Sequence, residues 1–353
     1  MKKWTVLLIL VLAVTTVSNV FAISESAVLF LLISPGARAS GMGEAFVALA
    51  DDATATYWNS AGLAFQEGRE LSLMHCKWLP GLVDDMYYDF ACYRQYFESL
   101  GGTLGANITY LNMGEQVWMG ESADQKLGTF YSYDFAVSFS YATKLNQNLG
   151  LGVTMRFIQS LLAPDWVKVG EEKGKGSGNA FAVDVGVLYK MPFIPGLSFG
   201  ANLSNMGPKI TYADADQADP IPTNLKIGFA YRAVDMEYNR LTLTIDTNKL
   251  LIVKKPGETK ADPWSKAIFT AWSDGSVREQ MKRLISSVGM EYVYNNMISL
   301  RAGYYYDETG KVKFPSFGAG LTYMTYRFDF AYVAAEQGHP LADTMRFTLT
   351  IGF

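Results

Sequence analysis

Cysteine is scarce in this chain, which has two cysteines among its 353 residues. We expect Cys76 and Cys92 on neighbouring strands of one hairpin that turns near Leu82. In that register Cys76 faces Tyr88 across the hairpin. Cys92 faces Ser72, so the two sulfur atoms are too far apart to form a disulfide. The sequence therefore predicts two free thiols, and it argues against a disulfide framework and a cysteine metal site.

Histidine is equally rare, which argues against an enzyme. His75 lies in an expected strand and His339 in a loop beside Pro340, and neither has a nucleophile or a second metal ligand at a catalytic spacing. We find no glycine-rich phosphate-binding loop, and the net charge of −4 carries no signature of nucleic-acid binding. We therefore expect no catalysis, no cofactor, no metal ion and no nucleic-acid partner.

Long hydrophobic runs are also missing after residue 22, so we expect no transmembrane helix in the mature protein. Before that point, Lys2 and Lys3 precede the apolar stretch Val6–Val14, and Val20 and Ala22 match the small-residue pattern of a signal-peptidase site. The apolar stretch is too short for a membrane anchor, and the absence of a nearby cysteine argues against a lipoprotein. The sequence predicts a signal peptide over residues 1–22.

Strict alternation of apolar and polar residues is the strongest feature that the sequence does contain. Between Tyr131 and Tyr141 the odd positions are aromatic or aliphatic, whereas the even positions are small or polar. Only an extended strand separates two such sets onto opposite faces. The same pattern recurs in further segments of about ten residues, which is the length of a tilted membrane strand.

Fourteen segments are expected to be strands, and their connections differ in length. The expected strands are 69–78, 85–96, 101–113, 128–144, 147–160, 179–190, 196–206, 223–233, 239–248, 285–294, 297–305, 315–323, 326–334 and 344–353. The longer connections are 114–127, 161–178, 207–222, 249–284, 306–314 and 335–343. The short ones include Leu145–Asn146, Met191–Pro195 and Asn295–Asn296. Long loops interspersed with tight turns favour an outer-membrane barrel over a soluble sandwich.

The predicted fold is therefore all-β: a transmembrane antiparallel β-barrel of about 14 strands over residues 69–353. An even strand count places both termini in the periplasm. Phe353 ends the last strand and resembles the terminal signal that the bacterial barrel-assembly machinery recognises. Tyrosines on the apolar face, among them Tyr88 and Tyr141, are expected in the aromatic girdle that contacts outer-membrane lipid.

Charged residues on the polar face are expected to line the lumen. They are Asp89, Asp134, Arg156, Asp184, Lys190, Lys226, Arg232, Asp246, Glu291, Arg301, Arg327, Asp329 and Arg346. Their mixed signs favour an interior joined by ion pairs over a channel selective for one sign of ion. A simpler interpretation is that these residues only solvate a filled interior.

Fourteen strands enclose a lumen wider than side chains alone fill, and residues 23–68 are long enough to plug it. This segment is rich in glycine and alanine, and its apolar run Ala45–Ala50 suits packing against the barrel wall. A mobile periplasmic tail is the alternative, but such a tail should be more polar. We expect an N-terminal hatch that plugs the lumen.

The hatch segment resembles a known family. Residues Gly36 to Ala64 read GARASGMGEAFVALADDATATYWNSAGLA, and this motif is similar to the N-terminal hatch of the PorV/PorQ family within the FadL-like outer-membrane barrels. Residues Asn202–Tyr212 and Ile221–Gly228 resemble the same family's middle region. One departure is Ser60, because the family usually has proline after the hatch asparagine.

Ten hatch positions are candidate site residues. They are Gly36, Arg38, Gly41, Gly43, Asp51, Asp52, Tyr57, Trp58, Asn59 and Gly62. The glycines permit tight turns and close approach to the wall. Asp51 and Asp52 either pair with luminal arginines or lie in a solvated turn. Tyr57 and Trp58 anchor the plug or, alternatively, stack on a ligand.

The resemblance implies a role in type IX protein secretion. In that system such barrels bind the C-terminal signal domain of secreted cargo and hand the cargo to partner machinery, a translocon or sortase. The cargo is expected to meet the extracellular loops, and loop 249–284 carries the apolar residues Trp264, Phe269 and Trp272. The alternative is a FadL-like transporter of long-chain fatty acids or other hydrophobic molecules, which needs an apolar luminal pocket.

Overall fold

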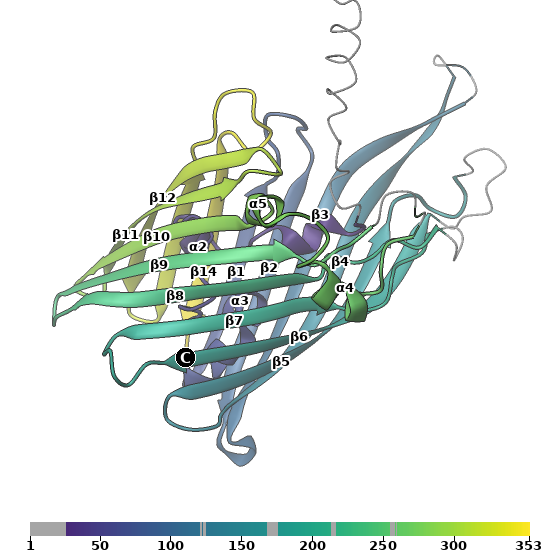
Figure 1. Ribbon diagram of the computed structural model, residues 1–353. Helices are drawn as coiled ribbons and strands as arrows, with labels where there is room; N and C mark the ends of the chain where they lie inside the picture. Colours follow the sequence, from purple (N-terminus) through teal and green to yellow (C-terminus); the bar gives the residue numbers. More distant parts are fainter. Residues whose placement is uncertain are drawn as a thin grey trace, which may run out of the picture.

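The computed structural model describes residues 26–120, 122, 125–167, 176–212, 217–254, 258 and 260–353. The predicted signal peptide, residues 1–22, lies outside these residues. Fourteen antiparallel strands form one closed barrel, in which each strand pairs with its neighbours in the sequence and β14 pairs with β1 (Figure 1). The strands are β1 (Arg69–Lys77), β2 (Tyr87–Phe97), β3 (Gly102–Met119), β4 (Lys126–Lys144), β5 (Leu149–Leu161), β6 (Ser177–Lys190), β7 (Leu197–Met206), β8 (Asn224–Asp235), β9 (Asn239–Leu250), β10 (Ile285–Tyr294), β11 (Ile298–Asp307), β12 (Val312–Tyr323), β13 (Tyr326–Val333) and β14 (Thr344–Gly352).

All fourteen predicted strands are present, and the predicted register of the first hairpin is confirmed. Cys76 pairs with Tyr88 and Ser72 pairs with Cys92. Both cysteines are buried free thiols. The period of two fixed both which residues are extended and how this hairpin is aligned.

Two of the predicted loops were too long. The predicted loop 114–127 is mostly strand, because β3 continues to Met119 and β4 begins at Lys126. A bulge between Asn112 and Glu115 interrupts the alternation there, which hid the continuation. The predicted loop 306–314 shrinks to residues 308–311 in the same way, since three consecutive tyrosines at the end of β11 obscure the period of two.

Long and short connections lie at opposite ends of the barrel. Counted from the connection between β1 and β2, the odd-numbered connections span 78–86, 120–125, 162–176, 207–223, 251–284, 308–311 and 334–343. The even connections span 98–101, 145–148, 191–196, 236–238, 295–297 and 324–325. We call the two ends the long-loop end and the short-turn end. The start of β1 and the end of β14 both lie at the short-turn end, where Arg69 and Phe353 exchange two backbone hydrogen bonds of 3.1 Å.

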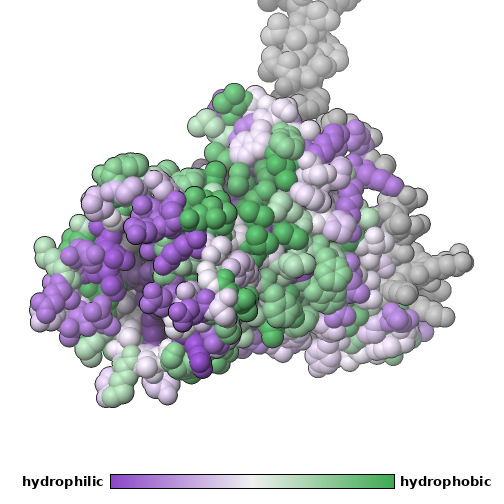
Figure 2. All heavy atoms as spheres, turned by 90° about the horizontal axis from the view of Figure 1, so that it is seen from below, coloured by the Kyte–Doolittle hydropathy of each residue, from purple (hydrophilic) through white to green (hydrophobic). Residues whose placement is uncertain are grey.

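The outward face of the wall is hydrophobic. Large apolar side chains on neighbouring strands remain exposed there, including Phe139 at 66%, Met155 at 67% and Phe181 at 68%. Figure 2 shows a broad hydrophobic area beside a hydrophilic one. At the long-loop end of β2 to β4 a row of tyrosine rings follows this face, with Tyr110 5.8 Å from Tyr133. Such a belt bordered by aromatic rings matches the lipid-facing surface of a membrane barrel.

The prediction for β2 was wrong in its choice of face. Tyr88 is fully buried and points inward, whereas Asp89 points outward and lies 2.7 Å from the ring nitrogen of His75. Aromatic residues occupy both faces of this strand, because Tyr87 and Tyr93 alternate with Tyr88 and Phe90. Composition alone therefore could not identify the inward face.

The chain before β1, residues 26–68, lies inside the barrel, and we call it the hatch (Figure 1). It contains the short helices η1 (Leu29–Leu32), α2 (Ala37–Ser40), α3 (Ala55–Trp58) and η2 (Ser60–Phe65). Further short helices are η3 (Glu98–Leu100), α4 (Trp264–Thr270) and α5 (Val277–Lys282). Among the described residues no helix is long and apolar enough to cross a membrane. The hatch fills a lumen whose wall consists of the fourteen strands.

Hatch backbone packs directly on wall backbone, which glycine makes possible. A Cβ atom on Gly41 would lie 2.9 Å from the Cα atom of Gly318 on β12, and one on Gly43 would lie 2.5 Å from the amide nitrogen of Tyr304 on β11. Gly43 also has a φ of +65°, a conformation that side chains disfavour. Gly36, with a φ of +90°, directs its N–H toward the sulfur of Met74 at 2.9 Å.

Candidate functional site

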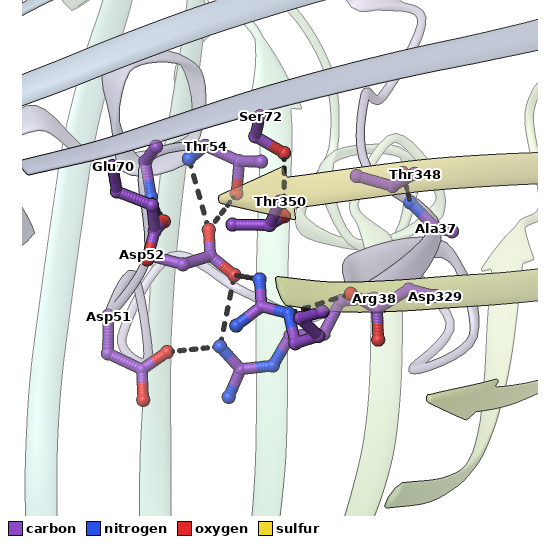
Figure 3. Close-up of polar contacts among 12 residues, drawn as sticks. Ala37, Arg38, Asp51, Asp52, Thr54, Glu70, Ser72, Asp329, Thr348 and Thr350 are labelled. Atoms are coloured by element: carbon purple, nitrogen blue, oxygen red, sulfur yellow. Dashed lines mark hydrogen bonds and ion pairs between the residues drawn. The ribbon is translucent and has the colours of Figure 1, made fainter. Parts of the chain in front are cut away.

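An ion-pair network joins the hatch to the wall (Figure 3). Arg38 on α2 is its centre, and its side chain is only 12% exposed. Its guanidinium lies 2.6 Å from Asp51 and 3.0 Å from Asp52, both in the hatch, and 2.7 Å from Glu291 on β10. One hatch arginine thereby fixes both the hatch turn and its position against β10.

The wall continues the network through three more residues. Arg301 on β11 contacts Glu291 at 2.7 Å and Asp329 at 2.8 Å. Arg327 on β13 contacts Asp329 at 2.8 Å and reaches back to Asp52 at 3.1 Å. Three arginines and three carboxylates thus form a closed circuit across three strands and the hatch, and Asp51 is attached to it through Arg38. This geometry supports the prediction, made from the mixed signs of the inward charges, that ion pairs join the interior, in preference to a channel selective for one sign of ion.

Asp52 has the most constrained environment in the network. Its carboxylate accepts hydrogen bonds from the hydroxyl of Thr54 at 2.5 Å and from the amide of Thr54 at 3.0 Å. Burial opposes ionisation of Asp52, but Arg327 and Arg38 outweigh it and lower the pKa of this carboxyl below its usual range. Asp51 is 42% exposed, so it lies at the solvated edge of the same turn.

A second pair holds the end of β7. Arg156 on β5 contacts Asp184 on β6 at 2.7 Å and also donates to the side chain of Asn205. The amide of Asn205 donates to Asp184 at 2.7 Å, and its φ is +59°. The chain leaves the wall just beyond, since β7 ends at Met206. The pair thereby stabilises this end of β7.

The other predicted lumen charges have separate environments. Asp134 is 4% exposed and makes no ion pair within the described residues. Lys226 lies beside the hatch, with its ammonium 4.3 Å from the Trp58 ring. Arg232 is not part of the sealed lumen, because it lies near the short-turn end, 41% exposed, and pairs with Asp235 at 3.2 Å. Its position on the inward face of the alternation was therefore not enough to place Arg232 in the lumen.

Some of the hatch contacts come from residues that the sequence did not single out. Glu70 on β1 accepts from the amide of Ala53 at 2.6 Å and lies 3.6 Å from Arg94. Glu44 lies 3.5 Å from Arg346 and accepts a hydrogen bond from Ser34. Glu44 could have been recognised from the sequence, because it is a charged residue within an apolar, glycine-rich segment. Arg94 was missed because the face of β2 was misassigned.

Asn59 and the neighbouring turn attach the hatch to β6. The side-chain amide of Asn59 donates to the carbonyl of Val47 at 2.9 Å and to that of Val187 at 3.0 Å. Its carbonyl oxygen accepts from Ala61 at 3.1 Å and caps η2. Gly62 follows in this helix, and a side chain there would collide with the hatch backbone. These hydrogen bonds define the turn in which Ser60 stands where the resembling family usually has proline.

Tyr57 and Trp58 lie within the hatch packing. The indole N–H of Trp58 donates to the carbonyl of Pro35 at 3.2 Å, and the hydroxyl of Tyr57 donates to that of Leu31 at 3.1 Å. The two rings meet edge to face at 5.4 Å. With Lys226 over the indole, the arrangement favours the anchoring interpretation over ligand stacking.

One side of the lumen is apolar. Inward residues of β1 to β6, among them Met74, Phe90 and Ile158, pack against Phe30 and other hatch residues near η1. This cluster departs from the small, polar and charged residues that the alternation places on the inward face, and the misassigned face of β2 concealed it. Hatch side chains pack into this apolar region.

Loop 251–284 folds onto the outer surface of the wall. Residues of α4 and of the segment just after β9, Leu251 and Val253, pack on the outward side chains Leu203 and Leu225. Lys249 donates to the carbonyl of Ala271 at 2.6 Å and so fastens the loop to β9. The predicted binding residues lie here with 36% exposure for Trp264, 77% for Phe269 and 47% for Trp272. The loop thus presents an aromatic surface at the long-loop end.

The chemistry of the described residues offers no metal site, since no three histidine, cysteine, aspartate or glutamate side chains are grouped to hold an ion. Phe353 is 62% exposed at the outer rim of the short-turn end.

Comparisons with known proteins fit this geometry. A family model described as type IX secretion system protein PorV matches residues 17–257. No match was found among curated proteins.

Solved structures share the fold. The P. putida toluene transporter TodX is 11% identical with a TM-score of 0.54, and the match covers 91% of this chain and 99% of that chain. The Ralstonia pickettii toluene transporter TbuX is 14% identical with a TM-score of 0.50, covering 91% and 98%. A Pseudomonas aeruginosa FadL homologue is 12% identical with a TM-score of 0.52, covering 89% and 97%. At these identities the likeness concerns the fold, which is that of the FadL-like outer-membrane barrels.

Proposed function

Because this chain belongs to the PorV family of type IX secretion system proteins, we propose that it binds secreted cargo at the outer membrane and hands it to partner machinery. The family and the fold are those of secretion and transport barrels, not of enzymes. The cargo would be recognised through its C-terminal signal domain. A translocon or a sortase would receive it.

The plugged lumen is the observation that carries this proposal. The hatch fills the barrel, and Arg38 and Asp52 tie it to strands β10 and β13. A secreted protein cannot pass through such an interior, so protein cargo would be handled at the surface. Exposed aromatic residues at the long-loop end supply a surface of the right kind, because aromatic side chains dominate binding at protein interfaces.

The orientation in the membrane is part of the proposal. Long loops face the outside in outer-membrane barrels, and short turns face the periplasm. Both ends of the barrel wall would then be periplasmic, after cleavage of a signal peptide over residues 1–22. The domain boundaries would be the hatch over 23–68 and the barrel over 69–353. Phe353 would serve as the signal for the barrel-assembly machinery.

Replacing Phe269 with Asp tests the proposed cargo surface. Phe269 is 77% exposed, so the variant should fold, yet a carboxylate at its position would oppose an apolar interface. Cells with this variant should retain secreted proteins in the periplasm, and less cargo should co-purify with the barrel in mild detergent. The matched control is Phe193→Asp, because Phe193 is 70% exposed and lies in a short turn at the opposite end of the barrel. Equal secretion by the two variants would contradict the assignment of this loop.

A second candidate function is transport of hydrophobic molecules. The apolar cluster between η1 and strands β1 to β6 favours it, as does the shared fold with toluene transporters. This function requires Phe30 and its neighbours to move aside for a ligand. Native mass spectrometry of the purified barrel separates the two candidates: a stoichiometric fatty acid without a protein partner supports transport, whereas co-purified cargo supports secretion.

A further inference from the structure

The hairpin of β3 and β4 extends beyond the neighbouring strands at the long-loop end (Figure 1). β2 pairs with β3 only up to Asn112, and β5 pairs with β4 only from Tyr133 onward. We call the part beyond both neighbours, residues 115–119 of β3 and 126–132 of β4, the projecting hairpin. Within the described residues its two strands pair with each other and with no further strand.

The outer edge of β4, on the side of β5, has backbone groups that no described residue pairs. The amide of Glu115 donates to the carboxylate of Asp85 at 2.7 Å, away from β4. Glu115 lies opposite Tyr131, so the backbone N–H and C=O of Tyr131 also point away from the hairpin axis. By the alternation of the ladder, those of Thr129 point the same way. Neither residue has a backbone hydrogen bond on this edge in the described part of the chain.

The outward face of the projecting hairpin is apolar and open. Val117 is 50% exposed and Tyr131 is 61% exposed on this face. The chain after β5 covers the opposite face, where the ring of Trp166 lies 5.9 Å from that of Trp118 and 6.3 Å from that of Phe130. The protein therefore packs one face of the hairpin itself and leaves the other face and the edge unoccupied.

Water, and not lipid, surrounds this part of the hairpin. The tyrosine row that borders the hydrophobic belt ends at Tyr133, before the projecting hairpin begins. Glu115 is exposed on the outward face opposite Tyr131, and charged side chains are costly on a lipid-facing surface. Unpaired backbone groups are also costly in hydrocarbon. In water, a strand edge beside apolar side chains is a template for pairing with another chain.

A second copy of this chain does not fit the edge in a membrane. Two copies in one membrane point the same way, and a two-fold axis along the membrane normal relates them. Under this rotation both β4 strands still run from the long-loop end to the short-turn end, and their tilts turn to opposite sides. The two strands then cross, whereas antiparallel pairing requires opposite directions. The added strand must come from a different polypeptide.

We propose that the outer edge of β4 at residues 127–131 binds an extended segment of another protein as an additional antiparallel strand. The added strand would continue the line of β5, whose ladder on β4 ends at Tyr133. Hydrogen bonds to the main chain of Thr129 and Tyr131 provide the affinity, and an apolar side chain at alternate positions packs beside the Tyr131 ring. The inference concerns this hairpin and not loop 251–284, so it does not depend on the proposed cargo surface.

Fluorescence anisotropy of a labelled peptide, with the full chain in lipid nanodiscs, tests the proposal. The peptide repeats residues 126–132, KLGTFYS, and because it is free of the membrane it can run antiparallel to β4. We expect saturable binding. Two further peptides carry N-methyl groups on alternate amides, one on residues 127, 129 and 131 and the other on 128 and 130. One of them should bind at least tenfold more weakly and the other within twofold, because only one edge of an added strand faces β4.

Thr129→Pro removes one N–H on the outer edge and leaves the pairs with β3 intact, and strand edges tolerate proline. This variant should weaken binding of the unmethylated peptide at least tenfold. The matched control Thr129→Ala keeps the amide and should bind within twofold of the parent. Heat-modifiable migration on gels shows whether each barrel is folded, and the methylated peptides test the unmodified chain if Thr129→Pro does not fold.

Three results would overturn the proposal. The two methylated peptides could bind equally, or the two Thr129 variants could bind alike, and either result would mean that the main chain does not carry the binding. The third is that no peptide saturates the folded chain, which would mean that lipid or the chain's own loops cover the edge. Light scattering in detergent adds a check on the occupant: a dimer that Thr129→Pro dissociates would assign the edge to a second copy and would also overturn the proposal.

Discussion

At the residue scale, Asp52 is the hatch carboxylate that joins two arginines of the ion-pair network, Arg38 of the hatch and Arg327 of the wall. Replacing it with Asn leaves Arg38 and Arg327 each short of one carboxylate in a buried site. Breaking a buried pair in this way costs about 3–5 kcal/mol. We expect Asp52→Asn to loosen the hatch and to cause conductance in planar bilayers. Asp51→Asn is the control, because Asp51 is 42% exposed and its loss should leave the bilayer sealed.

The charge state of Asp52 gives a second prediction at this scale, which concerns pH. Neighbouring arginines lower the pKa of Asp52 in the folded protein, despite its burial. The stabilisation is therefore complete above the ordinary pKa of about 3.9 and is lost as the pH falls through the lower, folded value. We expect the amide of Thr54, which donates to Asp52, to keep its protection from hydrogen exchange between neutral pH and about pH 4, and to lose it only in stronger acid. A loss of protection already near pH 6 would contradict this assignment.

At the element scale, the strands separate lipid from lumen. Val185 on β6 points outward and is 42% exposed, so Val185→Arg places a charge in the lipid. The expected cost is about 2–4 kcal/mol if the site lies near the midplane of the bilayer. Refolding into lipid vesicles across a denaturant series measures it. Val185→Leu keeps the apolar character and should refold like the parent. Equal stability of the Arg and Leu variants would place this face away from lipid.

Strands were the most predictable elements, because a lipid-facing wall forces a period of two on the sequence. That period identified all fourteen strands and the pairing of Cys76 with Tyr88. The period of two failed near Gly114, where a bulge interrupts the alternation. It also failed on β2, because the hatch rather than water fills the lumen there and permits the aromatic Tyr88 to point inward. Loop 251–284 was recognised as apolar, but its packing on Leu203 depends on tertiary contacts that a single sequence does not reveal.

The candidate site was predicted less completely, for a similar reason. Sequence similarity identified the hatch, and parity placed Glu291, Arg301 and Asp329 on the inward face. Which arginine meets which carboxylate depends on strand register and on the hatch path, both of which are long-range. The circuit through Arg38 and Arg327 therefore became visible only in three dimensions.

At the scale of the whole molecule, the barrel and the hatch form a closed unit, and removing the hatch should open it. A fourteen-strand wall without residues 29–64 would enclose a water-filled lumen, because its inward face carries many polar and charged residues. We expect the full chain to exclude small sugars in liposome-swelling assays, and the hatch deletion to admit them. The deletion must first show heat-modifiable migration, which confirms a folded barrel. A folded deletion variant that still excludes sugars would mean that the loops close the lumen, and the hatch would then serve to present the wall and its loops to partners.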